Sequence, residues 1–149
     1  MKNPAKRKGK RKMWILLIIV GLIAAGLIGG IMADAPGRRE INDLTFADIN
    51  FKDLKNGSYI GEFKSTGAQF RNATVEATIS EGKLSNVKIL KGALDKEGKP
   101  QKLKDDRGID DFFNDVISSQ TLQVDVISGA TITCKAHLKA LEDALEKAR

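Results

Sequence analysis

The chain has 149 residues and a formal net charge of +6, which leaves room for one domain and one appended segment. Seven of the 25 basic residues precede residue 13, and the other 18, set against 19 acidic residues, leave the rest of the chain at −1. The positive charge therefore belongs to the N-terminal tail, where no aromatic residue is interleaved to stack on bases. We accordingly expect no nucleic-acid partner.

An uncharged segment of 20 residues, 13–32, follows the basic tail at residues 1–12. A helix of this length spans about 30 Å, the thickness of the hydrocarbon core of a bilayer. Trp14 lies at one end, where interfacial aromatic rings are common. The charges of the tail predict a single-pass helix in the lipid bilayer of the cell membrane, with a cytoplasmic N-terminus and an extracytoplasmic domain.

A cleaved signal peptide is the alternative, because Ala33-Asp34-Ala35 is similar to a small-residue cleavage site. The apolar segment is longer than the roughly 7–15 residues usual in signal peptides, and Pro36 would directly follow the cut. An uncleaved anchor is therefore favoured.

Gly26 and Gly30 have the spacing that lets two membrane helices approach closely. They are candidates for the contact face of a transmembrane helix partner, but small residues are common in membrane helices for other reasons, and this simpler interpretation is favoured.

Residues 33–55 are predicted to be a linker, and residues 35–37, Ala-Pro-Gly, to end the membrane helix. An apolar pattern of mixed period in this linker is compatible with either a short helix or an edge strand against the domain. Its members are Leu44, Phe46, Ile49, Phe51 and Leu54.

Alternating apolar residues predict three strands at the start of a domain that covers residues 56–149. They are Ser58–Lys64, Thr74–Ile79 and Leu84–Leu90. The last two are joined by a tight turn at residues 81–83, so they must be antiparallel. The inward positions are Val75, Ala77, Ile79, Val87 and Ile89.

The second half of the domain is predicted to contain two helices. Residues 92–108 are polar and are expected to form a loop, and Gln123–Val126 alternates like a short last strand. Strands followed by helices in a short domain indicate an α+β fold, a small antiparallel sheet packed with helices, preceded by the transmembrane helix. The two predicted helix faces are Ile109, Phe112, Phe113, Val116 and Ile117, then Leu138, Leu141, Leu145 and Ala148.

The segment Asp125–Thr133 has the sequence DVISGATIT and carries most of the functional information. A strand, a turn at Ser128 and Gly129, and a helix N-terminus together place free N–H groups and the positive end of the helix dipole at one spot. Such a spot binds anions. From the residues alone, helix capping by the hydroxyls of Thr131 and Thr133 is the simpler interpretation.

The pattern Asp-x-x-Ser-Gly-Ala-Thr-x-Thr before an apolar helix resembles the signature of the FMN-binding domain family. Residues 57–63 are similar to the opening Gly-x-Tyr-x-Gly strand of that family, and residues 73–87 to its two central strands around a Gly-Lys hairpin. The family includes flavin subunits of sodium-pumping NADH:quinone oxidoreductases and of Rnf complexes. In it, the motif threonine is esterified to the phosphate of FMN by a flavin transferase that uses FAD as donor.

This resemblance implies that FMN is attached covalently to Thr131 through a threonine phosphoester. The backbone of Ser128, Gly129 and Ala130 would then supply donors to the phosphate, and Thr133 a hydroxyl donor. Asp125 is better interpreted as a recognition or framework residue, because a carboxylate in contact with the phosphate would repel it. The implied partners are the flavin transferase and redox proteins in the membrane or outside the cytoplasm.

The sequence shows no general-base pair, nucleophile triad or metal cluster, so we assign no catalytic and no metal-binding residue. Cys134 and His137 lack the two further ligands that a metal site needs. The acidic pairs at 105–106 and 110–111 are interpreted as solvated charge near a helix start. Candidates for an isoalloxazine surface are Tyr59, Phe63, Phe70, Phe112 and Phe113, for which core packing is the more common role.

We therefore interpret the protein as an electron carrier, whose cofactor does the chemistry, rather than as an enzyme with its own substrate. Two alternatives stay open. The chain is either a flavin subunit of an ion-pumping complex of the Rnf or NADH:quinone oxidoreductase type, or a non-redox extracytoplasmic binding or sensor module in which Thr131 only caps a helix.

Overall fold

The computed structural model describes residues 5–67 and 69–149, without the side chains of residues 5–11 and 30–34. Residues 1–4 of the basic tail therefore lie outside what is described, as do the side chains of residues 5–11, of Ala33 and Asp34 in the alternative cleavage site, and the surroundings of Gly30. The chain divides into two compact units, Met1–Pro36 and Gly37–Arg149.

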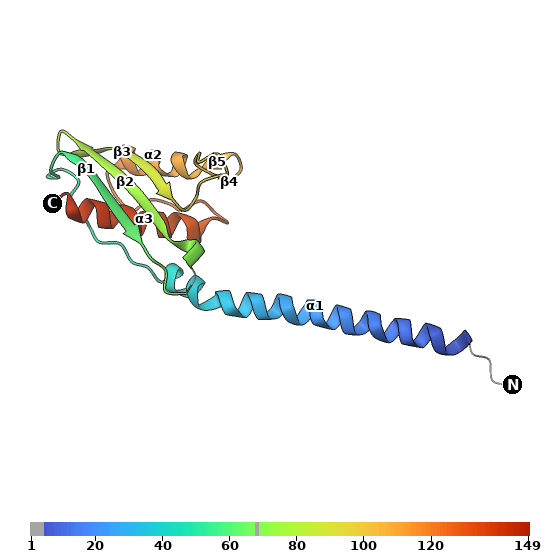
Figure 1. The fold of residues 1–149 in the computed structure, drawn as a ribbon. Helices are drawn as coiled ribbons and strands as arrows, with labels where there is room; N and C mark the ends of the chain where they lie inside the picture. The colour runs from blue at the N-terminus through green and yellow to red at the C-terminus, as the bar shows by residue number, and fades with distance from the viewer. Residues whose placement is uncertain (1–4, 68) are drawn as a thin grey trace. The chain divides into compact units, whose positions relative to one another are not determined.

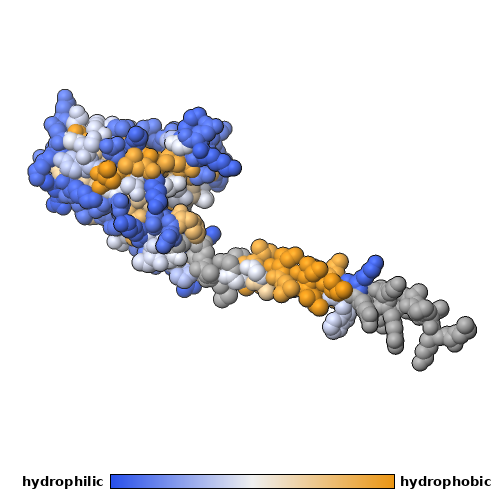
Figure 2. Space-filling view, in the orientation of Figure 1, coloured by the Kyte–Doolittle hydropathy of each residue, from blue (hydrophilic) through white to orange (hydrophobic). Residues whose placement is uncertain are grey.

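The described residues of the first unit, 5–36, belong to a single helix, α1 (Ala5–Asn42), whose last turn belongs to the second unit. Large apolar side chains between Met13 and Ile28 are all exposed, and they form the apolar surface of this helix in Figure 2. The helix is long and apolar enough to cross a membrane, and an N-terminal signal sequence has the same features.

The prediction that residues 35–37 end the helix is wrong, because α1 continues past Pro36. Proline removes one helical hydrogen bond and weakens a helix interior, but tertiary contacts can offset that loss. The last turn has such contacts within the second unit. Ile41 is fully buried there, and Glu40 accepts hydrogen bonds from the Ser65 hydroxyl and the Thr66 N–H, at 3.0 and 3.1 Å.

The predicted strands are confirmed as an antiparallel sheet in chain order, β1 (Gly57–Phe63), β2 (Ala73–Ser80) and β3 (Lys83–Lys91). Strands β1 and β2 pair from Gly57 opposite Ile79 to Phe63 opposite Ala73. The turn between β2 and β3 has positive φ at Glu81 and Gly82, as a tight hairpin requires. The predicted inward residues of β2 are buried, which gives the sheet one apolar face.

Two helices cover that apolar face, α2 (Ile109–Ser119) and α3 (Thr131–Lys147) (Figure 1). Helix α3 packs on β1 and β2, and α2 packs on β3. Gly61 permits the close approach of α3, because a Cβ there would lie 1.9 Å from the Ala140 carbonyl oxygen. The α+β fold class predicted from the sequence is therefore confirmed, as are the buried faces of both helices.

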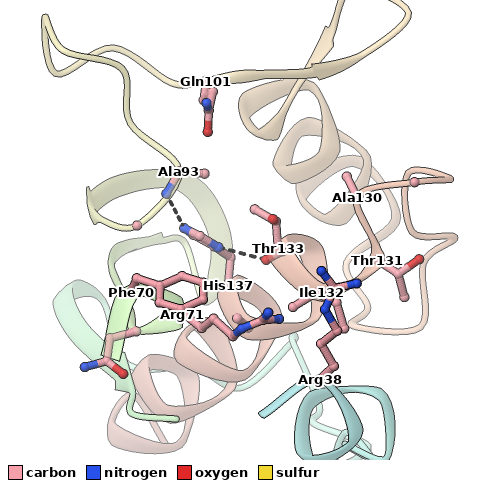
Figure 3. Close-up of a pocket in the computed structure, with 14 residues that line it drawn as sticks. Arg38, Phe70, Arg71, Ala93, Gln101, Ala130, Thr131, Ile132, Thr133 and His137 are labelled. Carbon is pink, nitrogen blue, oxygen red and sulfur yellow. Dashed lines mark hydrogen bonds between the residues drawn. The ribbon is translucent and has the colours of Figure 1, made fainter. Parts of the chain in front are cut away.

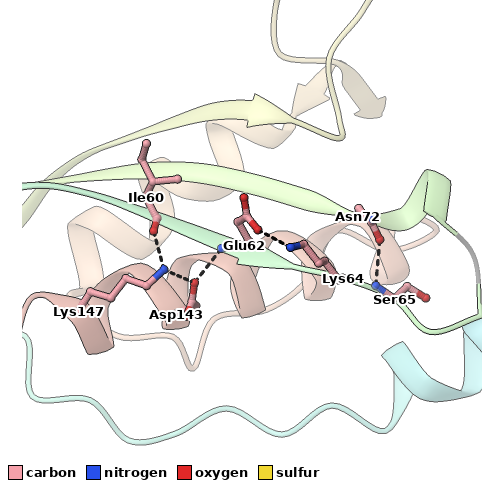
Figure 4. Close-up of polar contacts among 7 residues, drawn as sticks. All are labelled: Ile60, Glu62, Lys64, Ser65, Asn72, Asp143 and Lys147. Carbon is pink, nitrogen blue, oxygen red and sulfur yellow. Dashed lines mark hydrogen bonds and ion pairs between the residues drawn. The ribbon is translucent and has the colours of Figure 1, made fainter.

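Polar side chains of α3 occupy the outer edge of β1 (Figure 4). Asp143 accepts a hydrogen bond from the Glu62 N–H at 2.9 Å, and Lys147 donates to the Ile60 carbonyl at 2.8 Å. Lys147 also pairs with Asp143 at 2.8 Å. These contacts satisfy backbone groups that an edge strand would otherwise present to another chain.

The segment between α1 and β1 was expected to form either a short helix or an edge strand. It forms neither, because residues 44–56 contain no helix and no strand. Its apolar side chains are nevertheless in the core, with Ile49, Phe51 and Leu54 buried. Backbone contacts to α3 hold it, for example the Ala47 N–H to Glu142 at 2.7 Å. The compact unit that contains the sheet thus begins at Gly37.

Two further predictions need correction. The predicted loop 92–108 contains a small hairpin, β4 (Lys102–Lys104) and β5 (Arg107–Gly108). Residues 123–126 form no strand. The Gln120 side chain accepts the Leu84 N–H and donates to the Leu84 carbonyl, so these two backbone groups of β3 are bonded by a side chain and not by a further strand.

Candidate functional site

The start of α3 is built by a tight turn at the predicted motif. Gly129 has φ of +83°, which glycine adopts without strain, and the Ala130 N–H closes the turn on the Ile127 carbonyl at 2.9 Å. Helix α3 then begins at Thr131, with Ala130 as its N-cap residue. The predicted glycine turn and helix start are both present, although no strand leads into them.

This helix start lacks the usual capping groups. Ala130 has no polar side-chain atom, no side chain caps the terminus, and the first turn contains no acidic residue. The first N–H groups of a helix have no acceptor within it, and together with the helix dipole they attract an anion. Thr131 is the first residue inside the helix and not its N-cap, so its position does not support the interpretation of Thr131 as a simple helix cap.

A cavity of about 440 Å³ opens beside this helix start (Figure 3). Four of the six predicted site residues line it: Gly129, Ala130, Thr131 and Thr133. Ser128 is exposed on the turn and does not line the cavity. Asp125 is also exposed, and it lines two other surface hollows and not this cavity.

Two arginines line the same cavity and were not predicted as site residues. Arg38 comes from the end of α1, and Arg71 from a short 3-10 helix, η1 (Gln69–Arg71), between β1 and β2. In Figure 3 Arg38 extends toward the first turn of α3. No local pattern could have indicated either residue, because only the fold brings them to the cavity that the motif lines.

An exposed aromatic ring also borders the cavity. Phe70 is 77% exposed, and the Arg71 guanidinium lies over its ring at 5.0 Å from the centroid. The structure thereby separates four of the five aromatic candidates. Phe112 and Phe113 are fully buried in the core, and Phe63 is buried too, whereas Phe70 is a cavity residue.

His137 forms part of the cavity wall and is held between two backbone segments (Figure 3). Its Nε2 accepts the Ala93 N–H at 3.1 Å, and its Nδ1–H donates to the Thr133 carbonyl at 2.8 Å, which is the neutral tautomer. Burial lowers the pKa of His137, against the opposing effect of the Thr133 hydrogen bond. Gly92 makes room for the ring, because a Cβ there would lie 2.6 Å from Nε2.

Cys134 and His137 are both internal to the fold. Cys134 is fully buried, and this burial raises the pKa of its thiol. Within the described residues 5–67 and 69–149, no group of three or more His, Cys, Asp or Glu side chains is placed to hold a metal ion.

The cavity combines the determinants of an anionic ligand with those of a planar aromatic one. A helix N-terminus and two guanidinium groups favour a phosphate or carboxylate, and the Phe70 ring offers a flat apolar surface. Its volume falls within the range of about 300–1,000 Å³ that is usual for small-molecule sites.

Comparison with known proteins agrees with these determinants. The family described as the FMN-binding domain matches residues 71–146, about half of the chain, and this range includes η1 in part, the sheet from β2 onward, both helices and the motif. No curated protein and no solved structure matches the chain significantly.

Proposed function

Since this chain belongs to the FMN-binding domain family, we propose that it is a membrane-anchored flavoprotein that holds FMN covalently on Thr131 and carries electrons between redox partners. The residues around the cavity fit this cofactor. The uncapped start of α3 suits the phosphate, and Phe70 suits one face of the isoalloxazine. When bound, FMN supplies the electron-transfer chemistry, and the protein holds and tunes it.

Thr131 is supported as the attachment residue by its place at the first position of α3, where it is half-buried and lines the cavity. Attachment from FAD forms a bond between the Thr131 hydroxyl oxygen and the FMN phosphorus. It breaks the pyrophosphate bond of FAD, releases AMP, and leaves the hydroxyl proton to the transferase or solvent. The remaining phosphate charge then lies at the positive end of the helix dipole.

An electron carrier is favoured over an enzyme with its own organic substrate. The single histidine of the chain has both ring nitrogens in hydrogen bonds to backbone groups, so it has no nitrogen to offer a substrate proton. The loaded protein should accept electrons from small reductants and pass them to artificial acceptors. Saturable reduction of the flavin by one particular metabolite would contradict the carrier role.

The attachment site can be tested by intact mass and visible spectrum of the full chain, coexpressed with a flavin transferase. Wild type should carry one FMN, and Thr131→Ala should be colourless yet folded, because Thr131 is not the capping residue. Thr131→Ser keeps the hydroxyl and should still be loaded. Thr133→Ala removes a possible donor to the phosphate but not the attachment oxygen, so it should still carry covalent flavin. A Thr131→Ala protein that stays yellow after denaturing gel filtration would exclude this residue.

The membrane orientation needs a separate test. The seven positive charges before the apolar segment favour a cytoplasmic N-terminus, and hence an extracytoplasmic domain. Protease added to intact spheroplasts should digest the domain. Digestion only after lysis would show the reverse orientation, and a mature chain that begins near residue 36 would show that the segment is a cleaved signal peptide.

A further inference from the structure

One wall of the cavity comes from outside the segment that matches the family. Arg38 lines the cavity, although it precedes residues 71–146 and lies in the last part of α1. This residue belongs to the same compact unit as the motif. The cavity proposed for the cofactor is therefore lined in part by a residue outside the segment 71–146 that matches the family.

The last turn of α1 is held firmly against the domain, which gives Arg38 a defined place. Ile41 is fully buried in the core, and Lys135 of α3 donates to the Asn42 carbonyl. Burial alone would raise the pKa of Glu40, but hydrogen bonds from Thr66 and Ser65 outweigh it and lower that pKa. Glu40 thus stays ionised and keeps its hydrogen bonds at neutral pH.

We propose that Arg38 is a positioning residue for the cofactor, whose guanidinium pairs with the phosphate of the flavin on Thr131. The inference rests on the proposed function, since it concerns the same site. A threonine–FMN phosphodiester retains one negative charge, and a guanidinium binds phosphate oxygens through charge-assisted hydrogen bonds. A contact with the phosphate can contribute to stability only when flavin is present, so the proposed pairing is measured by the flavin-dependent part of any change in stability.

The test compares Arg38→Gln with Arg39→Gln in the full chain, purified in detergent. Arg39 follows directly in the same helix, is exposed and does not line the cavity, so it controls for charge. Each variant is made loaded, with the transferase, and unloaded, without it. We expect the loaded-minus-unloaded difference in Tm to shrink by about 4 °C or more in Arg38→Gln and to stay unchanged in Arg39→Gln. Arg38→Lys should keep part of the difference.

A second measurement uses the Thr131→Ala background, in which FMN can bind only without a covalent bond. Adding Arg38→Gln should weaken FMN binding by about tenfold and leave riboflavin, which lacks the phosphate, unaffected. Equal behaviour of the Arg38 and Arg39 variants in both measurements would overturn the proposal, as would a loss in Tm that is the same with and without flavin. A wild-type chain that never acquires FMN would instead refute the proposed function.

Discussion

Helices α2 and α3 lie on the same face of the sheet, yet their N-termini are built in opposite ways. At the start of α2, the Asp111 carboxylate accepts the Gly108 N–H at 2.8 Å, and the first turn carries two acidic residues, Asp110 and Asp111. At the start of α3, the N-cap is Ala130 and the first turn has no acidic residue. The protein itself therefore supplies negative charge to one helix dipole and not to the other.

The difference shows what the α3 terminus is suited for. A capped and acidic N-terminus is already satisfied and repels further anions, as at α2. The α3 terminus instead borders a cavity that two arginines also line. An anionic ligand in this cavity would supply the negative charge that no side chain provides at the start of α3. In the function proposed for this family member, the FMN phosphate would carry the charge that is missing there.

The largest loss of stability is expected from a substitution that displaces His137, whose ring packs against Gly92 and bonds the first turn of α3. In Gly92→Ala the new methyl group would collide with His137, and the φ of +117° at this position is strained for alanine. We expect a loss of about 2–3 kcal/mol in the free energy of unfolding, together with reduced flavin loading. Urea unfolding of the unloaded protein measures the first effect. Gly98→Ala is the control, because it also has positive φ but open space around it.

A carboxylate introduced at the N-terminus of α3 should make this terminus resemble the N-terminus of α2. In Ala130→Asp the negative charge stabilises the helix dipole of the unloaded protein by about 0.3–1 kcal/mol. The same charge repels the FMN phosphate, so the extent of loading in a fixed time should fall by about tenfold. Stability and loading thus change in opposite directions. Ala130→Asn has the same shape without the charge, and normal loading of Ala130→Asp would contradict the comparison.

Removing the N-terminal cap of α2 should lower the free energy of unfolding without changing the extent of flavin loading. Asp111→Asn weakens the hydrogen bond to the Gly108 N–H and removes a charge from the first turn, at a cost of about 1 kcal/mol. Asp110→Asn removes a charge from the same turn but no such bond, so the difference between the two isolates the cap. Flavin loading should equal that of wild type in both. A loading defect specific to Asp111→Asn would show that the two termini are coupled.

The parts of this structure that the sequence predicted are those whose information is local. The alternation of β2 and the helical spacing of α2 and α3 repeat along each whole element, and the glycine turn before Thr131 is specified by adjacent residues. The short alternation at residues 123–126 was misleading, because an alternating segment becomes a strand only where a partner offers free backbone groups.

The rest depended on tertiary contacts that no spacing reveals. Pro36 was expected to end α1, but burial of Ile41 and the hydrogen bonds of Glu40 stabilise a further turn. The same contacts bring Arg38 to the cavity. Phe70 could not be separated from the core aromatics by sequence alone, because its exposure is set by where η1 lies in the fold.

A pH dependence is also expected at the α3 terminus, transmitted by His137. Burial lowers the pKa of this histidine in the folded protein below the ordinary value of about 6.5 that it has when unfolded. Below that pH the unfolded state therefore binds more protons than the folded state, and stability falls as pH falls, by at most about 1.4 kcal/mol per pH unit. Protonation at Nε2 would also break the hydrogen bond from the Ala93 N–H and loosen the first turn of α3. Urea unfolding between pH 7.5 and pH 5.5 should show a decline in wild type that His137→Gln lacks, and equal slopes for the two proteins would remove His137 as the cause.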